Sequence, residues 1–322
     1  MNAAIAAIVV ALALHAPGAL GGEWRPSKPV EMVVPTSAGG AADQTGRYIQ
    51  RLLQGRIGTD MAVINKGGAG GAIAYAYLNQ KQGDGHYLSL STLNLVTNRI
   101  TRPNVLGHDD VTAICQLYGE YPVIVVKADS QYSSGKDLIA KLRQDPSAAS
   151  IAFSPGLGGA LHLATATVMR AGGVDAKKLR IVVTQSSADS ITSLLGGHVD
   201  VGVMTPANVI PHLEAGRLRV LGIAAPRRMQ GALAVAPTWK EQGVPGISAS
   251  WRGVIGPKGM SPAQVSYWEG AFAQLVKTEE WKRHVEMNAR SDEFMGSRET
   301  ARYYEAQHKE LHALLVSLGI AK

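Results

Sequence analysis

The chain has 322 residues, of which 46% are hydrophobic and 18% are charged, and 32 Lys and Arg against 25 Asp and Glu give it a formal charge of +7. This composition excludes a disordered chain, and the length suits about two domains with a substantial core. The 36 glycines follow no Gly-X-Y period, which excludes collagen. The single cysteine, Cys115, cannot form a disulfide within the chain or a multi-cysteine metal site, so we expect a buried thiol.

The first 22 residues carry no charge and resemble a secretory signal in their pattern. An apolar run covers residues 3–14, and the small residues Ala19 and Gly21-Gly22 follow it. The run is shorter than the about 20 residues that span a bilayer, but it suits the apolar region of a signal peptide, although no Lys or Arg precedes it. We expect export to the periplasm and cleavage near Gly21-Gly22. Since no Leu-x-x-Cys pattern follows, we expect a soluble protein and not a lipoprotein.

From Pro29 onward, short β-type runs alternate with helical stretches. Three strands are predicted in the first part of the chain, each followed by a polar or Gly-rich loop and a helix. The strands are at residues 30–34, 61–65 and 87–91, and the first two helices run from about Asp43 to Arg56 and from the second loop to about Gln80. This alternation predicts an α/β fold with a mainly parallel sheet.

Two long extended segments indicate a division into two lobes. The first, residues 114–126, is interrupted by Gly119 and Pro122, and a second strand series follows it at 151–153, 181–183, 199–204 and 220–224. The second segment, residues 251–256, is the expected return crossing, and beyond it we expect an almost entirely helical chain to Leu318. The predicted organisation is a signal peptide at 1–22, a first lobe at 23–121 plus 253–322 and a second lobe at 122–252.

Five strand-to-helix loops rich in Gly, Ser and Thr are candidate binding elements. Such loops let a ligand approach the backbone, and the helix after each one presents free N–H groups and a positive dipole end. One loop of this kind is an ordinary connection, but five on two facing lobes favour a small-anion site in the cleft between them, at the carboxyl ends of the strands. The loops cover residues 36–42, 66–71, 154–160, 184–188 and 205–208. No Gly-x-Gly-x-x-Gly or Walker pattern supports a nucleotide.

Catalytic and metal patterns are absent from the sequence. There is no Gly-x-Ser-x-Gly, and His308 and His312 lack the acid of His-Glu-x-x-His. His308 instead falls on an apolar helix face with Tyr304, Leu311, Leu315 and Leu318, which predicts packing. His162 lies in the first turns of the helix after residues 154–160, where it could donate to a bound acid or cap and pack the loop. The basic residues are scattered, so we expect no nucleic-acid binding, and the charge of +7 is at most a weak attraction for anions.

Several motifs together resemble one family. The chain is similar to the periplasmic receptors of tripartite tricarboxylate transporters, the Bug-type solute-binding proteins, over essentially all of its length after the signal. Finer features, namely residues 43–45, 110–121 and 251–254, are similar to the tricarboxylate-binding branch. The motifs are Val33-Val34-Pro35-Thr36-Ser37-Ala38-Gly39-Gly40-Ala41-Ala42-Asp43, Asn65-Lys66-Gly67-Gly68-Ala69-Gly70-Gly71, Gly83-Asp84-Gly85-His86-Tyr87-Leu88, Leu194-Leu195-Gly196-Gly197-His198-Val199-Asp200, residues 213–219, residues 236–244 and Trp251-Arg252-Gly253-Val254.

The resemblance implies the class II periplasmic binding protein fold, with two α/β lobes joined by two crossing strands. It implies a receptor without catalytic activity or cofactor that closes on a small, citrate-like di- or tricarboxylate. The receptor would deliver this ligand to the large and small membrane subunits of the transporter, and we expect a monomer. The implied ligand-binding residues are Thr36, Ser37, Ala38, Gly39, Gly40, Asp43, Gly68, Gly70, Thr92 and Asn94 in the first lobe, Ser154, Gly158, Gly159, His162, Thr184, Gln185, Ser186 and Thr205 in the second, and Arg252 at the crossing.

Two of these residues have a second interpretation. Asp43 would stabilise the N-terminus of its helix, an interpretation that we favour over direct ligand contact. Arg252 could pair with a second carboxylate or brace the hinge. The sequence departs from the tricarboxylate branch at Ala41-Ala42, where that branch has a further Gly and a Trp, at residues 184–187, where it has a Gly-rich loop, and at Lys66 or Gly67, where it has Pro.

Two other functions remain open on the sequence. One is a small-carboxylic-acid enzyme that uses His162 with Asp43 or a nearby serine. The other is a receptor that serves an ABC importer. The first predicts turnover of the ligand, whereas the second predicts binding alone.

Overall fold

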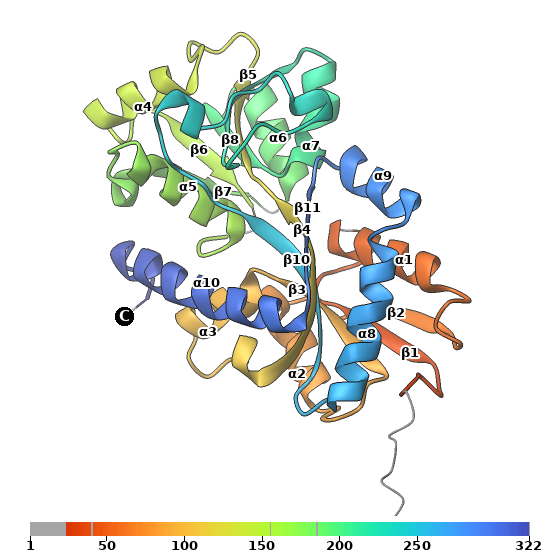
Figure 1. The fold of residues 1–322 in the computed structure, drawn as a ribbon. Helices are drawn as coiled ribbons and strands as arrows, with labels where there is room; N and C mark the ends of the chain where they lie inside the picture. Colours follow the sequence, from red (N-terminus) through yellow and green to blue (C-terminus); the bar gives the residue numbers. More distant parts are fainter. Residues whose placement is uncertain (1–23, 40, 155, 185, 322) are drawn as a thin grey trace, which may run out of the picture.

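The computed structural model describes residues 24–39, 41–154, 156–184 and 186–321. The expected signal peptide and two of the expected ligand residues, Gly40 and Gln185, lie outside this described part. The chain folds into two α/β lobes, each built on one sheet (Figure 1). None of the helices described combines the length and the apolar character that a membrane crossing requires.

The first lobe contains a six-stranded sheet of order β11-β4-β10-β3-β1-β2. Strand β1 runs parallel to β2 and β3, whereas β10 runs antiparallel to β3 and β4, and β11 antiparallel to β4. The predicted mainly parallel sheet is therefore wrong, because the returning strand β10 enters between two strands of the opposite direction. The strands are β1 (Val30–Val34), β2 (Met61–Asn65), β3 (Tyr87–Thr92), β4 (Val111–Glu120), β10 (Ser250–Pro257) and β11 (Ser291–Met295).

Helices cover both faces of this sheet, and α8 and α10 lie on opposite sides of it in Figure 1. Alternation along β1 sends Val34 into one core with Trp268 and Val33 into the other with Trp251 and Tyr304. The first helix spans Ala41–Leu53, slightly earlier than predicted. The helices of the first face are α1 (Ala41–Leu53), α8 (Pro262–Leu275) and α9 (Glu279–Met287), and those of the second are α2 (Ala72–Asn79), α3 (Asn94–Thr101) and α10 (Ser297–Ser317).

The second lobe contains a five-stranded sheet of order β7-β6-β8-β5-β9. Strand β6 is parallel to β7 and β8, whereas β5 is antiparallel to β8 and β9. Its core has two parts, one against α4 and α5 and one against α6 and α7. The elements are β5 (Val123–Lys127), α4 (Gly135–Gln144), β6 (Ser150–Phe153), α5 (Ala160–Ala171), β7 (Arg180–Val183), α6 (Ser187–Leu195), β8 (Val201–Met204), α7 (Pro206–Glu214) and β9 (Leu218–Ile223).

The segments that connect the lobes differ in detail from the prediction. The expected single extended segment at 114–126 is two strands, β4 in the first sheet and β5 in the second, and they are separated at Tyr121-Pro122. The return segment is found as β10. The expected, almost entirely helical C-terminal part is found as α8, α9 and α10, but the prediction missed β11, which interrupts it and pairs with β4 at Ser291 and Gly119. Its sequence, Ser-Asp-Glu-Phe-Met, lacks strand-like alternation because β11 is a partly exposed edge strand.

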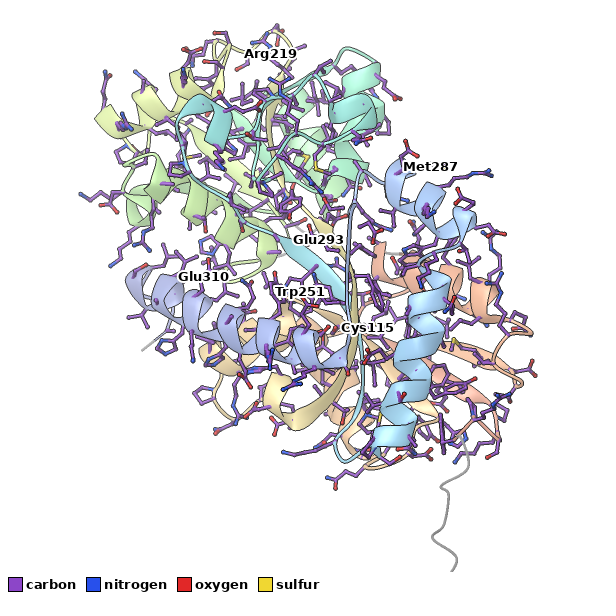
Figure 2. All side chains as sticks on the ribbon, in the orientation of Figure 1. Cys115, Arg219, Trp251, Met287, Glu293 and Glu310 are labelled. Atoms are coloured by element: carbon purple, nitrogen blue, oxygen red, sulfur yellow. The ribbon has the colours of Figure 1, made fainter. Side chains whose placement is uncertain are left out.

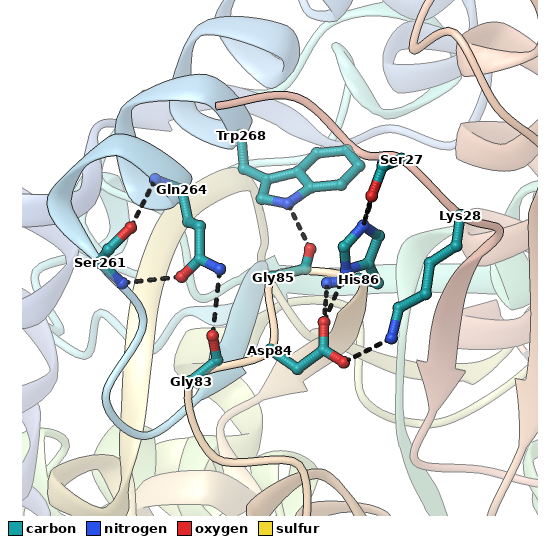
Figure 3. Close-up of polar contacts among 9 residues, drawn as sticks. All are labelled: Ser27, Lys28, Gly83, Asp84, Gly85, His86, Ser261, Gln264 and Trp268. Carbon is teal, nitrogen blue, oxygen red and sulfur yellow. Dashed lines mark hydrogen bonds and ion pairs between the residues drawn. The ribbon is translucent and has the colours of Figure 1, made fainter. Parts of the chain in front are cut away.

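The motif at residues 83–88 forms a turn at the amino end of β3 (Figure 3). Trp268 Nε1 donates to the Gly85 carbonyl at 2.8 Å, and Gln264 Nε2 donates to the Gly83 carbonyl at 3.0 Å. The Asp84 carboxylate accepts from Lys28 Nζ at 2.9 Å and from the His86 N–H at 3.0 Å. Burial opposes ionisation of Asp84, but these bonds outweigh it and lower its pKa to about 2. The turn therefore joins α8 to the sheet, at the opposite strand end from the candidate ligand loops.

Candidate functional site

The first candidate loop, residues 36–40, is fixed by a buried carboxylate. Asp43 is 3% exposed, and its Oδ2 accepts from the Gly39 N–H at 2.8 Å and from Arg47 Nε at 3.0 Å. Its Oδ1 accepts from Asn65 Nδ2 at 3.0 Å. Burial alone would raise the pKa of this carboxyl, but the three bonds lower it. Asp43 is ionised, and both of its carboxylate oxygens accept hydrogen bonds. It is therefore better suited to holding the loop than to binding an anion.

The first and second loops approach closely because Gly67 lacks a side chain. A Cβ at Gly67 would lie 2.8 Å from the Ser37 nitrogen, a distance that real Cβ atoms do not adopt. Asn65 Nδ2 also donates to the Thr36 carbonyl at 3.2 Å. Within the described part of the chain, the buried Thr36 hydroxyl has no hydrogen-bond partner, while Ser37 and Ala38 are exposed. Thr36 therefore offers an unused hydroxyl beside two loops that are locked together.

The second loop has an unusual backbone. Gly68, Ala69, Gly70 and Gly71 have positive φ angles of 119°, 47°, 64° and 88°, and for Ala69 this is a strained conformation. Asn98 Nδ2 donates to the Gly70 carbonyl at 2.9 Å. Among the described residues, no acceptor bonds the N–H groups of Gly68, Ala69 and Gly70. Successive free N–H groups of this kind form an anion-binding concavity.

Arg102, the residue that follows α3, supports the same loop. Its guanidinium donates to the Ala69 carbonyl at 2.9 Å and also bonds the Asn98 amide oxygen. The sequence interpretation missed Asn98 and Arg102, although their i, i+4 spacing on a helix places both on one face. Their contacts hold the carbonyls of the strained loop, so its N–H groups stay available.

Thr92, Asn94 and Arg252 meet at the carboxyl end of β3, where it pairs with β10 in the middle of the first sheet. Arg252 is the register partner of Thr92, and the Thr92 hydroxyl accepts from the Asn94 N–H at 3.3 Å. Arg252 Nη1 donates to the Trp251 carbonyl at 2.8 Å and to the Ser250 hydroxyl at 3.2 Å. In the described structure, its buried Nε has no acceptor. Arg252 thus both braces the crossing strand and retains a donor.

Tyr75 is a neighbour of this group that the sequence did not indicate. Its hydroxyl lies 3.4 Å from the Thr92 hydroxyl. Burial raises the pKa of Tyr75, although Thr92 and the positive charge of Arg252 oppose the shift. The Tyr75 hydroxyl is therefore neutral and lies beside the Arg252 cation. The sequence did not indicate this position, because only the fold brings Tyr75 next to Thr92 and Arg252.

In the second lobe, His162 holds the loop after β6. It is 7% exposed, and its Nδ1 accepts from the Gly158 N–H at 3.0 Å. Burial lowers the pKa of His162, so the ring is neutral and its proton lies on Nε2. Gly158 has a φ of 78°, and a Cβ there would lie 3.9 Å from the Thr101 methyl of the first lobe. The loop with Ser154, Gly158 and Gly159 therefore reaches toward α3.

Hydroxyls of the other loops in the second lobe are engaged by the helices that they begin. The Thr184 hydroxyl lies 2.6 Å from the Ser190 hydroxyl, and Ser186 accepts from the Asp189 N–H at 3.1 Å. The Thr205 hydroxyl accepts from Asn208 Nδ2 at 2.9 Å. These side chains form hydrogen bonds at the starts of the helices. We therefore expect the loops to bind a ligand through their backbone N–H groups.

Apart from Arg252, which is on the crossing strand β10 itself, the described candidate residues lie on one side of the crossing strands. In the first lobe they follow β1, β2 and β3, and in the second they follow β6, β7 and β8. The lobes also touch on this side, because Leu163 of α5 is fully buried in the core of Trp251 and Tyr304. The two named groups of the catalytic alternative are already engaged, because Asp43 accepts three hydrogen bonds and His162 Nδ1 accepts one. No cluster of three potential metal ligands occurs within the described ranges.

Residues 46–320 match the family model described as tripartite tricarboxylate transporter family receptor. The chain is 30% identical over 244 residues to Protein BugT of Bordetella pertussis, covering 74% of this chain and 73% of that one. It is 32% identical over 237 residues to the "UPF0065 protein in tcbD-tcbE intergenic region" of Pseudomonas sp., covering 73% and 69% of the two chains.

Solved structures have the same architecture. A TctC solute binding protein from Polaromonas has a TM-score of 0.76 at 26% identity, with 90% of this chain and 98% of that one covered. An R. palustris protein with adipate has a TM-score of 0.79 at 26% identity, with 92% and 99% covered. The predicted two-lobed α/β binding-protein fold is therefore confirmed.

Proposed function

Because the chain belongs to the tripartite tricarboxylate transporter receptor family, we propose that it captures a small di- or tricarboxylate between its lobes. The family comprises receptors, so the chain is a solute-binding receptor and not an enzyme. The Bug-type resemblance seen in the motifs is confirmed by the match to Protein BugT. No observation favours the alternative of an ABC importer.

The main support for a carboxylate ligand is the unused donor set of the first lobe. The strained loop at Ala69 presents consecutive N–H groups, and Thr36 adds a buried hydroxyl without a partner in the described structure. The negative charge of the nearby Asp43 is balanced by Arg47 and is also stabilised by hydrogen bonds from Gly39 and Asn65. A carboxylate would complete these bonds, since an unpaired buried polar group costs about 1–3 kcal/mol.

A second carboxylate of the ligand would face the crossing strand. Arg252 is the charged candidate residue with an unused, buried donor, and Thr92 and Tyr75 lie beside it. The R. palustris protein solved with adipate provides an example of a related receptor with a dicarboxylate. We therefore propose a ligand with at least two carboxylates, and citrate is one member of that class.

Closure of the second lobe would complete the site. The loops after β6, β7 and β8 would contribute backbone N–H groups from the regions of Gly158, Ser186 and Thr205. We propose that the protein works in the periplasm after removal of residues 1–22. The filled, closed form would then be recognised by the large and small membrane subunits of the transporter.

Calorimetric titration of the mature chain tests this proposal. The panel contains citrate, tricarballylate, adipate, malate and a set of aromatic acids. We expect saturable binding of at least one di- or tricarboxylate, and recovery of the bound molecule chemically unchanged. A panel in which every compound is silent would overturn the carboxylate proposal.

A further inference from the structure

A cavity of about 770 Å³ lies between the lobes beside the crossing at Tyr121, and we refer to it as the rear crevice. Its lining comes from the first lobe, the second lobe and the crossing, namely from Trp281, Lys282, Val285, Glu286 and residues 289–293, from residues 226–230, and from Tyr121. Figure 2 places Glu293 at the level of the crossing strands and Met287 at the end of α9. None of the candidate ligand residues of the preceding sections lines this cavity.

Strand order shows that the rear crevice and the ligand loops are on opposite sides of the hinge. In the first sheet, β11 pairs with β4 on the edge away from β3, β1 and β2. In the second sheet, β9 pairs with β5 on the edge away from β8, β6 and β7. The ligand loops follow the strands of one side, whereas the crevice is built by β11 and by the segment after β9. Ala289, which packs in the core of the second lobe, shows that the lobes touch here too.

The lining combines an apolar wall with a charged rim, in which the acids Glu286, Asp292 and Glu293 accompany the cations. Trp281, Val285, Met229 and Ala289 are at most 8% exposed and belong to the lobes' hydrophobic cores. The cations are Arg227, Arg228 and Lys282 at the exposed rim and Arg290 in the wall. Arg228 and Lys282 are paired with Glu241 and Glu279, whereas Arg227 makes no ion pair within the described residues.

Arg290 is the most deeply buried of these cations. Its side chain is 2% exposed, its Nη1 lies 2.8 Å from His284 Nε2 and its guanidinium stacks 4.4 Å from the centre of the Tyr118 ring. Its Nε is 3.8 Å from Glu120 Oε1, which is too long for a hydrogen bond.

Two buried donors in the lining therefore lack acceptors. In the described structure, neither Arg290 Nε nor Trp281 Nε1 has a hydrogen-bond partner. The nearby Glu293 cannot serve both, because its Oε1 accepts from the Tyr121 hydroxyl at 2.6 Å. A ligand oxygen that accepts from these groups would remove an unfavourable feature of the crevice.

We propose that the rear crevice is a second binding site, for a small organic anion with an apolar body, such as an aromatic monocarboxylate. The apolar body packs on Trp281 and Val285, and the carboxylate faces Arg227 and Arg290. The two lobes both contribute to this site, so its occupant senses their relative orientation.

Occupancy of the rear crevice favours closure of the ligand cleft. When two lobes rotate about a hinge, segments on opposite sides of the axis move in opposite senses. Closure of the cleft therefore widens the rear crevice, and a ligand that fills the widened crevice stabilises the closed form. This coupling rests on the proposed function, whereas the existence of the second site does not.

Fluorine NMR of 5-fluorotryptophan-labelled mature protein, titrated with benzoate, tests the site. The chain has five Trp residues, and replacement by Phe assigns the signals of Trp281 in the crevice and Trp251 in the core beneath the cleft. We expect the Trp281 signal to shift with saturation. A silent Trp281, including the case in which Trp251 alone responds, would overturn the proposal.

A matched pair of charge reversals locates the anion. Arg227→Glu removes the unpaired rim cation, and we expect half-saturation to need about tenfold more benzoate. Arg283→Glu makes the same charge change on α9 at an exposed residue outside the lining, and we expect less than a twofold effect. Equal weakening in both variants would indicate a non-specific charge effect and contradict the site.

Small-angle X-ray scattering tests the coupling separately. Benzoate alone should decrease the radius of gyration of the wild type and leave that of Arg227→Glu unchanged at the same concentration. Benzoate that moves the Trp281 signal without compaction would refute the coupling while the site stands. Because the Trp281 signal and the Arg227→Glu variant report on the rear crevice and not on the cleft, failure of the carboxylate panel and failure of this inference give different results.

Discussion

His162 Nδ1 accepts the Gly158 backbone N–H at 3.0 Å, and this bond ties the loop after β6 to the helix that follows it. The residue that resembled a catalytic or ligand-binding histidine thus has a clear supporting role. The bond requires an unprotonated Nδ1, which agrees with the lowering of the His162 pKa by burial.

Replacement of His162 should therefore loosen the loop. His162→Leu leaves the Gly158 N–H without its acceptor, and we expect the free energy of unfolding to fall by about 1 kcal/mol. We also expect carboxylate affinity to fall, because the loop loses its fixed position. Urea unfolding and calorimetry measure the two effects. The exposed His198 provides the control His198→Leu, and an equal effect there would contradict the bond's importance.

His284 should make the protein less stable in mild acid. Burial, assisted by Arg290 and Arg51, lowers its pKa to about 4, so the folded state binds a proton less readily than the unfolded state. The stabilisation of the folded state by the neutral His284 ring is complete above the unfolded pKa of about 6.5. It is lost as the pH falls toward 4. The shift corresponds to about 3 kcal/mol.

Urea unfolding between pH 7.5 and 4 measures this loss. In His284→Gln the amide oxygen can still accept from Arg290, but the side chain does not titrate. We expect the variant to lose less stability over this pH range than the wild type. Identical pH profiles would show that His284 is not the group responsible.

Asp84 should affect the stability of the protein at a lower pH than His284 does. Although burial raises its pKa, bonds from Lys28 and His86 lower it to about 2, so its stabilisation is complete above the unfolded pKa of about 4 and lost as the pH falls through 2. We expect Asp84→Asn to destabilise the mature chain by about 1 kcal/mol at pH 7, because solvent screens this partly exposed ion pair. Glu305→Gln, at an exposed site of α10, should change little. Thermal unfolding at pH 7 and pH 3 would reveal the predicted narrowing of the difference in acid.

Gly67 should be essential for the contact between the first two loops. In Gly67→Ala the new Cβ would lie 2.8 Å from the Ser37 nitrogen, so the backbone of the first loop must move. We expect a loss of about 1–3 kcal/mol in unfolding free energy and weaker carboxylate binding. Gly270→Ala is the matched control, because its Cβ meets no atom within 4 Å and it lies on the exposed side of α8. That change should stabilise the helix slightly, and retention of full affinity in Gly67→Ala would refute the loop contact.

The sequence predicted most of the fold because its strands carry strong local signals. Runs such as Val30–Val34 are apolar and precede Gly-rich loops, and the restart of this pattern after Pro122 predicted a second lobe. It missed β11, whose residues gain strand structure only by pairing with Gly119 and its neighbours. The composition of a short segment gives no information about such long-range strand pairing.

The candidate site, like the fold, was predicted only in part from the sequence. The Gly-rich loops were predicted from their composition and their place between strand-like and helical runs, and Asp43 was expected at the start of the first helix. The supports of the second loop, Asn98 and Arg102, were not, because they lie about 30 residues further along the chain and only the fold brings them to Gly70. The rear crevice likewise joins Arg227 to Arg290, which are distant in sequence.

Arg252 distinguishes a site for several carboxylates from a simple anion site. Its Nη1 braces Ser250 and Trp251, while its buried Nε lacks an acceptor in the described structure. If Nε pairs with a second carboxylate, Arg252→Ala should weaken a di- or tricarboxylate by about 1.5–3 kcal/mol, the value of a hydrogen bond to a charged group, and a monocarboxylate by much less. Calorimetry with adipate and its monocarboxylate analogue hexanoate measures the difference, and Arg298→Ala at an exposed site of α10 is the control. Equal weakening of both ligands would assign Arg252 to bracing the hinge alone, because a distorted crossing strand impairs closure on any ligand.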